Sequence, residues 1–331
     1  MSTTSRYLVG IDLGTTHSVM AYLDTSLLSE EGPPPVPILF EVPQVVLPGQ
    51  VEQRPLLPSF LYLAAATDFP ARALELPWTS GQDRNWVVGE LARQHGGNVP
   101  MRLVSSAKSW LAYDGVDRTA PILPYAAPAD GPDVVFKVSF VDAARYLEHL
   151  KDAWDHRMPG FPLSEQEVLI TVPASFDQVA RELTVRAAHS AGLAKVTLLE
   201  EPQAAFYAWL GRHPRSWRDL LHVGDVVLVC DVGGGTTDFS LMSVADQGGN
   251  LTVERIAVGD HILLGGDNMD LMLAMSVGKR LEREGHKLES WQRRQLLHSC
   301  RFAKEELLSA DRSKEVASVV VLGRGSKVSG G

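Results

Sequence analysis

The chain has 331 residues, a formal net charge of −9 at pH 7 and 45% hydrophobic residues, a composition that excludes wholesale disorder and counts against a chain-wide nucleic-acid surface. Its start lacks a signal-peptide pattern, no apolar run reaches the ~20 residues that cross a bilayer, and its two cysteines cannot form a disulfide framework. We therefore expect a soluble, cytoplasmic protein of two lobes or domains, with neither nucleic acid nor membrane among its partners.

Two strands are predicted at the start of the chain, Tyr7–Ile11 and Ser18–Leu23, joined by a turn at Gly14–His17. Proline and glycine then recur as far as Pro132. Because proline removes a backbone donor and fixes φ, this stretch is predicted to form loops and short edge strands rather than a helical domain.

Helical and strand patterns alternate from Ser139, a predicted N-cap, towards the end of the chain. A capping-box pattern at Ser175 and Gln178 predicts the start of a second helix, and Pro202 suits the first turn of a third. The predicted strands are Val168–Val172, Val196–Leu199, Val226–Cys230, Asp238–Val244 and Leu251–Val258, and the last two helices are Asp267–Arg283 and Ser290–Leu308, followed by a strand-like run at Val319–Leu322. Alternating strands and helices indicate an α/β fold.

The strongest signal is an internal repeat of the segments Val9–Thr16 and Leu228–Asp238. Each runs from an apolar strand through an aspartate, Asp12 or Asp231, into glycines, threonines and a second strand. Such a turn points backbone N–H groups into a concavity that binds phosphate oxygens, and the aspartate can hold a hydrated Mg²⁺. A plain glycine hairpin is the alternative for either segment alone. The shared aspartate and threonine positions favour two cradles that clamp one nucleotide from both sides.

These segments resemble the phosphate motifs of the actin–hexokinase–heat-shock ATPase superfamily. Within it, the chain is most similar to the nucleotide-binding domain of the 70-kDa heat-shock (DnaK-type) chaperones. Three further stretches carry the resemblance: Ile170–Phe176, Leu199–Ala205 and Gly265–Asp270. The resemblance implies a two-lobed actin-like ATPase fold of the α/β class, in which each lobe is a mixed β-sheet flanked by helices with a peripheral subdomain.

The resemblance also implies a division of the chain. Lobe I is expected at residues 1–214, with its core at 1–60 and 139–214 and a peripheral subdomain at about 61–138. Lobe II is expected at residues 215–331. Its core would cover about 215–260 and its peripheral subdomain about 261–331. Because the family's domain continues beyond this point, we expect lobe II to be incomplete and the peptide-binding domain to be absent.

The resemblance implies catalytic and metal-binding roles for matching residues. Asp12 and Asp231 would hold Mg²⁺ through water, together with flanking K⁺ ions, and Asp238 would lie near the ion sites. Glu201 would orient the water that attacks the γ-phosphate, and Thr236 would contact both. Orienting water and stabilising charge is most of what phosphoryl transfer requires.

The same resemblance implies nucleotide-binding and relay residues. The residues that would bind the nucleotide are Gly14, Thr15, Thr16, Gly233, Gly234, Gly235, Thr236, Thr237, Gly265, Gly266, Asp267 and Lys304, the last on a helix beside the adenosine. Pro173 and Arg181 would relay the nucleotide state to the domain surface.

Four of these residues also have ordinary explanations. Glu201 could be an acid favoured at a helix N-terminus, and Asp267 could be an N-cap. Arg181 could be a solvated charge on an exposed helix face, and Lys304 could form a helix-surface pair with a neighbouring glutamate. Only their ordered occurrence with the repeat favours the functional interpretation.

One departure from the family pattern concerns a lysine of the first lobe that contacts the γ-phosphate and the attacking water. The best local match, Val88–Arg93, puts Arg93 at this catalytic position, whereas Lys108 matches a different lysine. Arginine keeps the positive charge but replaces a compact ammonium with a wide planar fork. Nucleotide binding is therefore expected to persist, while turnover is less secure.

Taken together, these features predict an ATP-binding and ATP-hydrolysing chaperone domain with ATP/ADP, Mg²⁺ and K⁺ as ligands. A J-domain co-chaperone and a nucleotide exchange factor are implied as partners, and unfolded peptide would bind only through the absent C-terminal domain. A weakly hydrolysing regulatory module, consistent with Arg93, is the first alternative. A small-molecule kinase or a filament-forming bacterial actin of the same superfamily are the others.

Overall fold

A computed structural model describes residues 5–28, 35–81, 84–125, 127, 137–214, 216–248, 250–260, 262–310 and 314–323. Pro132, the end of the predicted loop region, lies outside them. Strands and helices mix in this part of the chain, which confirms the predicted α/β class. None of the helices within the described residues is both long and apolar enough to cross a membrane.

The larger sheet joins the first hairpin of the chain to two strands far along the sequence. In spatial order it contains β11 (Val196–Glu200), β10 (Glu167–Val172), β1 (Tyr7–Leu13), β2 (His17–Asp24) and β3 (Ile38–Leu39), with β6 (Leu57–Pro58) also paired to β2. β1 runs antiparallel to β2 and parallel to β10, which in turn runs parallel to β11. The predicted strands of this half are therefore confirmed, and they form a mixed sheet.

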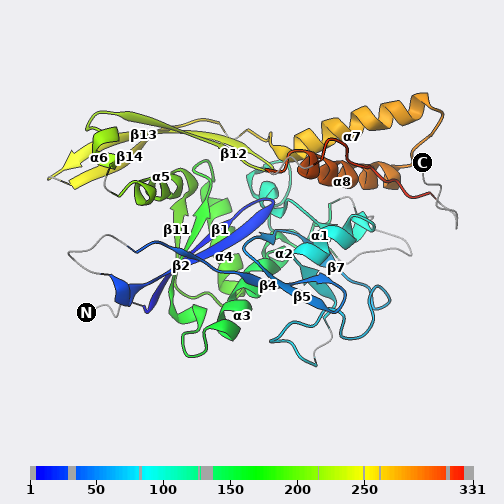
Figure 1. Cartoon of the computed structure of the whole chain (residues 1–331), viewed down its shortest axis with the longest axis horizontal. Coiled ribbons are helices and arrows are strands. Elements are labelled where there is room, and N and C mark those ends of the chain that lie inside the picture. Colours follow the sequence, from blue (N-terminus) through cyan, green and yellow to red (C-terminus); the bar gives the residue numbers. More distant parts are fainter. Residues whose placement is uncertain are drawn as a thin grey trace.

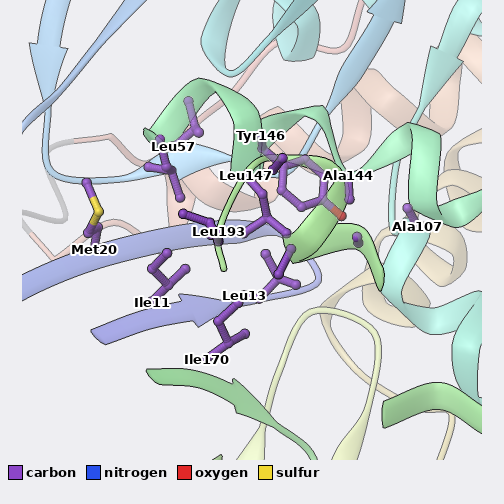
Figure 2. Packing of buried hydrophobic residues seen from close by; sticks show 14 of the residues in the cluster. Ile11, Leu13, Met20, Leu57, Ala107, Ala144, Tyr146, Leu147, Ile170 and Leu193 are labelled. Carbon is purple, nitrogen blue, oxygen red and sulfur yellow. The ribbon is translucent and has the colours of Figure 1, made fainter. Parts of the chain in front are cut away.

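Helices pack against this sheet. They are α2 (Phe140–Ala143), α3 (Arg145–Arg157), α4 (Gln178–Ser190) and α5 (Glu201–Arg212). Residues of α2, α3 and α4 build the main hydrophobic core together with the sheet. Figure 2 shows part of this cluster, to which Ile11 and Ile170 of the sheet and Leu147 of α3 belong, and all three side chains are at most 1% exposed. Burying a side chain of this size contributes about 1.5–3 kcal/mol, so this cluster fixes the sheet that carries the first turn.

The helix caps confirm one prediction and correct another. Ser139 accepts the backbone N–H of Asp142 at 3.2 Å and is the N-cap of α2, as predicted. The N-cap of α4 is Asp177, whose carboxylate accepts the N–H of Ala180 at 2.8 Å, so the capping prediction for Ser175 is wrong. The aspartate stands two residues closer to the first helical turn, and Ser175 Oγ donates to Asp238 instead.

The proline-rich stretch forms short strands around a small core, as predicted, together with one short helix that was not predicted. The strands are β4 (Val42–Leu47), β5 (Gln50–Arg54), β7 (Leu61–Leu63), β8 (Trp86–Val88) and β9 (Leu103–Val104). The helix is α1 (Glu90–Gly96). The 3₁₀ turns of this half are Thr25–Leu27, Pro100–Arg102, Ala107–Ala112 and Leu163–Glu165. Gly89 is the N-cap of α1, and its φ of +83° is a backbone conformation that favours glycine.

The second half is an antiparallel meander followed by a helix pair. The strands are β12 (Val226–Val232), β13 (Thr237–Gln247) and β14 (Asn250–Val258), and the helices are α6 (Trp217–Leu220), α7 (Gly266–Arg283) and α8 (Ser290–Leu307). Figure 1 shows the meander and the helix pair along one side of the rest of the molecule. A small cluster of Ala274, Leu296 and Cys300 joins α7 to α8. The predicted strands and both predicted helices are confirmed here.

The strand predicted at Val319–Leu322 is not formed. Val319 and Val321 pack against the α7–α8 cluster instead. The backbone between them finds partners on side chains of α8, because Ser299 Oγ donates to the carbonyl of Val320 at 2.8 Å. An extended apolar run can satisfy its backbone on a helix surface as well as in a sheet.

Candidate active site

The turns of the two repeated hairpins meet. A Cβ on Gly234 would overlap the methyl group of Thr16. A Cβ on Gly235 would lie 3.0 Å from Thr15 Cγ2 and 2.5 Å from Ser109 Oγ. Only glycine allows this approach. The two turns therefore face each other, as the repeat predicts.

Beside this meeting point lies a cavity of about 570 Å³, a size typical of small-molecule sites. Both hairpins contribute to its wall. From the predicted set, the cavity is lined by Asp12, Gly14, Thr15, Thr16, Pro173, Glu201, Asp231, Gly233, Gly234 and Thr236, and Lys108 and Ser109 also line it. Residues far apart in the sequence thus share one chamber between the two halves.

Three aspartates gather where the two repeats meet. Asp12 accepts a hydrogen bond from Thr171 Oγ1 at 2.6 Å. Asp231 stands opposite Asp238 in the β12–β13 register, and Asp238 accepts one from Ser175 Oγ at 2.9 Å. Burial raises the pKa of Asp231, and the charges of Asp238 and Asp12 raise it further. This arrangement favours a cation at the site.

The donor set agrees with a hydrated ion rather than a protein cage. Within the described ranges, no group of three or more histidine, cysteine, aspartate or glutamate side chains could hold a metal by itself. Mg²⁺ usually keeps several waters and binds one or two carboxylates together with substrate phosphates. Asp12 and Asp231, both on the cavity wall, fit that pattern.

A buried ion pair lines the cavity. Lys108 Nζ donates to Glu201 Oε1 at 2.5 Å, and the two side chains are only 7% and 17% exposed. Burial raises the pKa of Glu201, Lys108 counteracts this, and the nearby Asp12 and Asp231 add to the rise. Glu201 is the first residue of α5, but its side chain lines the cavity, where it pairs with Lys108. A simple helix-terminal role does not account for this contact.

Arg93 does not line the cavity, which corrects its predicted placement. On α1 it pairs with Glu90 at 3.0 Å and with Glu305 of α8 at 2.6 Å, and its guanidinium lies 4.8 Å from the centre of the Phe302 ring. The broad planar group suits two carboxylates and a ring. Lys108 is the cation of the cavity wall instead. The sequence contains no other lysine before Lys137, so Lys108 was the only lysine in residues 1–136 that could have been predicted as the cavity cation.

The start of α7 is hydrogen-bonded to the second turn and does not line the cavity. The N–H groups of Gly266 and Asp267 donate to the carbonyls of Gly233 and Gly234 at 3.1 and 2.7 Å. Gly265 is the N-cap of α7, and a Cβ there would lie 2.6 Å from those carbonyl oxygens. These N–H groups are therefore engaged by the protein, and nucleotide binding by Gly265, Gly266 and Asp267 stays a prediction.

Three other predicted residues join this support. Asp267 accepts from Ser106 Oγ at 2.5 Å and pairs with Arg301, so the N-cap interpretation of Asp267 is wrong. Lys304 donates to the carbonyl of Gly266 at 2.9 Å. Thr237 Oγ1 donates to the carbonyl of Leu264 at 2.8 Å. Their side chains position the second turn.

Of the two predicted relay residues, one lines the cavity and the other pairs with Glu200. Pro173 lines the cavity at the end of β10. Arg181 of α4 donates to Glu200 Oε1 at 2.9 Å and to the carbonyl of Phe176 at 3.1 Å, so it is not simply a solvated charge. Glu200 also pairs with Arg255 of β14. A charged chain therefore connects α4 to the second sheet.

Comparison with known proteins assigns the family. A sequence model described as Hsp70 protein matches residues 83–329. The chain belongs to the Hsp70 family. This membership agrees with the two-lobed actin-like ATPase fold implied by the sequence resemblance.

Two relatives within the Hsp70 family are chaperones named HscA. One from Photorhabdus laumondii is 29% identical over 339 residues, which covers 98% of this chain and 45% of the relative. One from Cronobacter sakazakii is 30% identical over 327 residues, covering 96% and 44%. An HscA homolog from Pseudomonas fluorescens is 32% identical over 311 residues, covering 92% and 42%. The chain thus spans less than half the length of these curated relatives.

Proposed function

We propose that this chain binds ATP and ADP with Mg²⁺ and hydrolyses ATP, as the nucleotide-binding part of an Hsp70 chaperone. The observation that carries the proposal is the cavity shared by two glycine–threonine turns, two strand-end aspartates and the Lys108–Glu201 pair. Each feature has an ordinary explanation alone. Their convergence on one chamber fits a magnesium–triphosphate ligand.

In this proposal, the two turns bind the phosphates. Thr15, Thr16 and Thr236 line the cavity, where their hydroxyl groups can donate to phosphate oxygens. Gly233 and Gly234 carry no side chain that would keep the phosphates from the backbone. The turns come from different halves of the chain, so a bound nucleotide would hold the halves together.

The aspartates would hold the metal. Asp12 and Asp231 would bind hydrated Mg²⁺ and flanking K⁺, and Asp238 would add negative charge beside them. The raised pKa of Asp231, caused by burial and by the charges of Asp238 and Asp12, supports this assignment. Bound Mg²⁺ would neutralise charge on the phosphates.

Hydrolysis would depend on the Lys108–Glu201 pair. Glu201 would accept a hydrogen bond from the attacking water, and Lys108 would stabilise negative charge on the terminal phosphoryl group. The Lys108 ammonium also favours the ionised form of Glu201 against burial. The alternative of a weakly hydrolysing module rested on Arg93 in place of a lysine, and the position of Lys108 in the cavity wall supports hydrolysis instead.

The nucleotide state would affect the junction of the two lobes and, in the whole protein, a peptide-binding domain. We propose lobe I at residues 1–214 and lobe II at residues 215–331, with Pro173 and Arg181 connecting the nucleotide to their junction. The Arg181–Glu200–Arg255 chain supports such a connection. A peptide-binding domain, a J-domain co-chaperone and an exchange factor complete the proposal.

Isothermal titration calorimetry tests the site. Wild-type protein is expected to bind ATP in the presence of Mg²⁺. Asp12→Asn and Asp231→Asn are each expected to weaken that binding, because they remove the charge that holds the metal. Unchanged affinity in both variants would contradict the proposed site.

A further inference from the structure

Ser109 carries a hydroxyl group that neither the fold nor the proposed mechanism uses. It follows Lys108 in the 3₁₀ turn Ala107–Ala112 and lines the same cavity. Its Oγ atom is buried and, within the described part of the chain, has no hydrogen-bond partner. Buried hydroxyl groups are generally paired, so an unpaired one in a cavity wall indicates a ligand.

The position of this hydroxyl group narrows the choice of ligand. A Cβ on Gly235 would lie 2.5 Å from Ser109 Oγ and 3.0 Å from Thr15 Cγ2. The hydroxyl therefore stands where the two phosphate-binding turns meet. The adjacent Lys108 holds Glu201, the carboxylate assigned to the attacking water. This is the reacting end of the cavity.

We propose that Ser109 Oγ donates a hydrogen bond to an oxygen of the terminal phosphoryl group of bound ATP. The inference rests on the proposed function. It makes Ser109 a residue that distinguishes triphosphate from diphosphate, because ADP has no group at that place. A hydroxyl group suits this role because it rotates to donate and adds no charge beside Lys108.

The test compares a non-hydrolysable ATP analogue with ADP by calorimetry in the presence of Mg²⁺. Ser109→Ala is expected to lower affinity for the analogue about tenfold or more, since a hydrogen bond to a charged group is lost. Affinity for ADP is expected to stay within about twofold. The thermal midpoint of the nucleotide-free variant is expected to be unchanged or higher, because the substitution removes an unpaired buried polar atom.

Ser106→Ala provides a matched control three residues earlier. Its hydroxyl already donates to Asp267 at 2.5 Å, so this variant is expected to lose stability and to bind both nucleotides with an unchanged ratio of affinities. Ser109→Cys keeps the volume with a weaker donor and decides the case if the alanine variant does not fold. The cysteine variant is expected to bind the analogue more weakly than wild type, again with little change for ADP.

The outcomes separate the two proposals. If wild-type protein binds neither nucleotide, the proposed function fails and the role of Ser109 fails with it. If wild-type protein binds both, and the Ser109 variants keep its ratio of analogue to ADP affinity within about twofold, the role of Ser109 is overturned while the function stands.

Discussion

Replacing Lys108 and Arg93 one at a time compares a cation that lines the cavity with one that does not. Lys108→Met removes the partner of Glu201 and the positive charge of the cavity wall. Losing one preorganised group that stabilises transition-state charge lowers turnover about 10²–10³-fold. Glu201 can take up a proton once its partner is gone, because burial already raises its pKa. The expected loss of folding stability is therefore small beside the loss of turnover.

Arg93→Met should give the opposite pattern. Arg93 pairs with the buried Glu90, which is 5% exposed, and with the more exposed Glu305, which is 39% exposed. Leaving Glu90 without this partner is expected to cost about 2 kcal/mol of unfolding free energy, below the 3–5 kcal/mol typical of a fully buried pair, because Arg54 also lies near Glu90. Turnover should change less than about tenfold, since Arg93 does not line the cavity.

Single-turnover hydrolysis and urea unfolding of both variants measure the two effects. We expect Lys108→Met to lose turnover with most of its stability, and Arg93→Met to lose stability with most of its turnover. A larger loss of turnover in Arg93→Met than in Lys108→Met would refute the placement of the catalytic cation at Lys108.

Three further predictions follow from the same structure. Glu201→Gln is expected to slow hydrolysis while ATP binding persists, and a normal single-turnover rate would remove its role. Burial raises the pKa of Glu201 above its ordinary value of 4.5. The stability of the wild type relative to Glu201→Gln is therefore expected to be greatest below about pH 4.5 and to fall as the pH rises through the folded-state pKa. Urea unfolding across that pH range measures the direction of this change. In hydrogen exchange, amides of β12 are expected to exchange faster than those of β1, because Val226 and Leu228 are 55% and 59% exposed whereas Val9 and Ile11 are buried, and equal protection would contradict this reasoning.

The hairpin repeat was accessible from the sequence because its information is local. An apolar strand, an aspartate and a glycine-rich turn specify a hairpin whatever surrounds them. Repetition of the pattern, in Val9–Thr16 and Leu228–Asp238, then supplied the long-range prediction that the two turns meet at one site, where they line a common cavity. The same reasoning located the strands and helices of both halves, whose apolar periodicity is strong.

The roles of Arg93 and of the start of α7 could not be obtained in this way. Arg93 has carboxylate partners on α1 and on α8, and Glu305 of α8 lies far away in the sequence. The N–H groups of Gly266 and Asp267 look free in the sequence, because nothing local indicates that carbonyls of the second turn accept from them. Side-chain and backbone partners set by tertiary packing decide such cases.

Ion pairs connect the two halves of the chain. Arg93 pairs with Glu305, and Glu200 joins Arg181 of α4 to Arg255 of β14. Opening the halves to admit or release a nucleotide would disturb one or both of these ion pairs, each of which is partly exposed and so contributes modestly. A bound nucleotide shifts the equilibrium between open and closed arrangements only by its different affinity for the two. If nucleotide binds as proposed, the groups of both turns that line the cavity would supply most of that difference, because the partly exposed ion pairs contribute modestly.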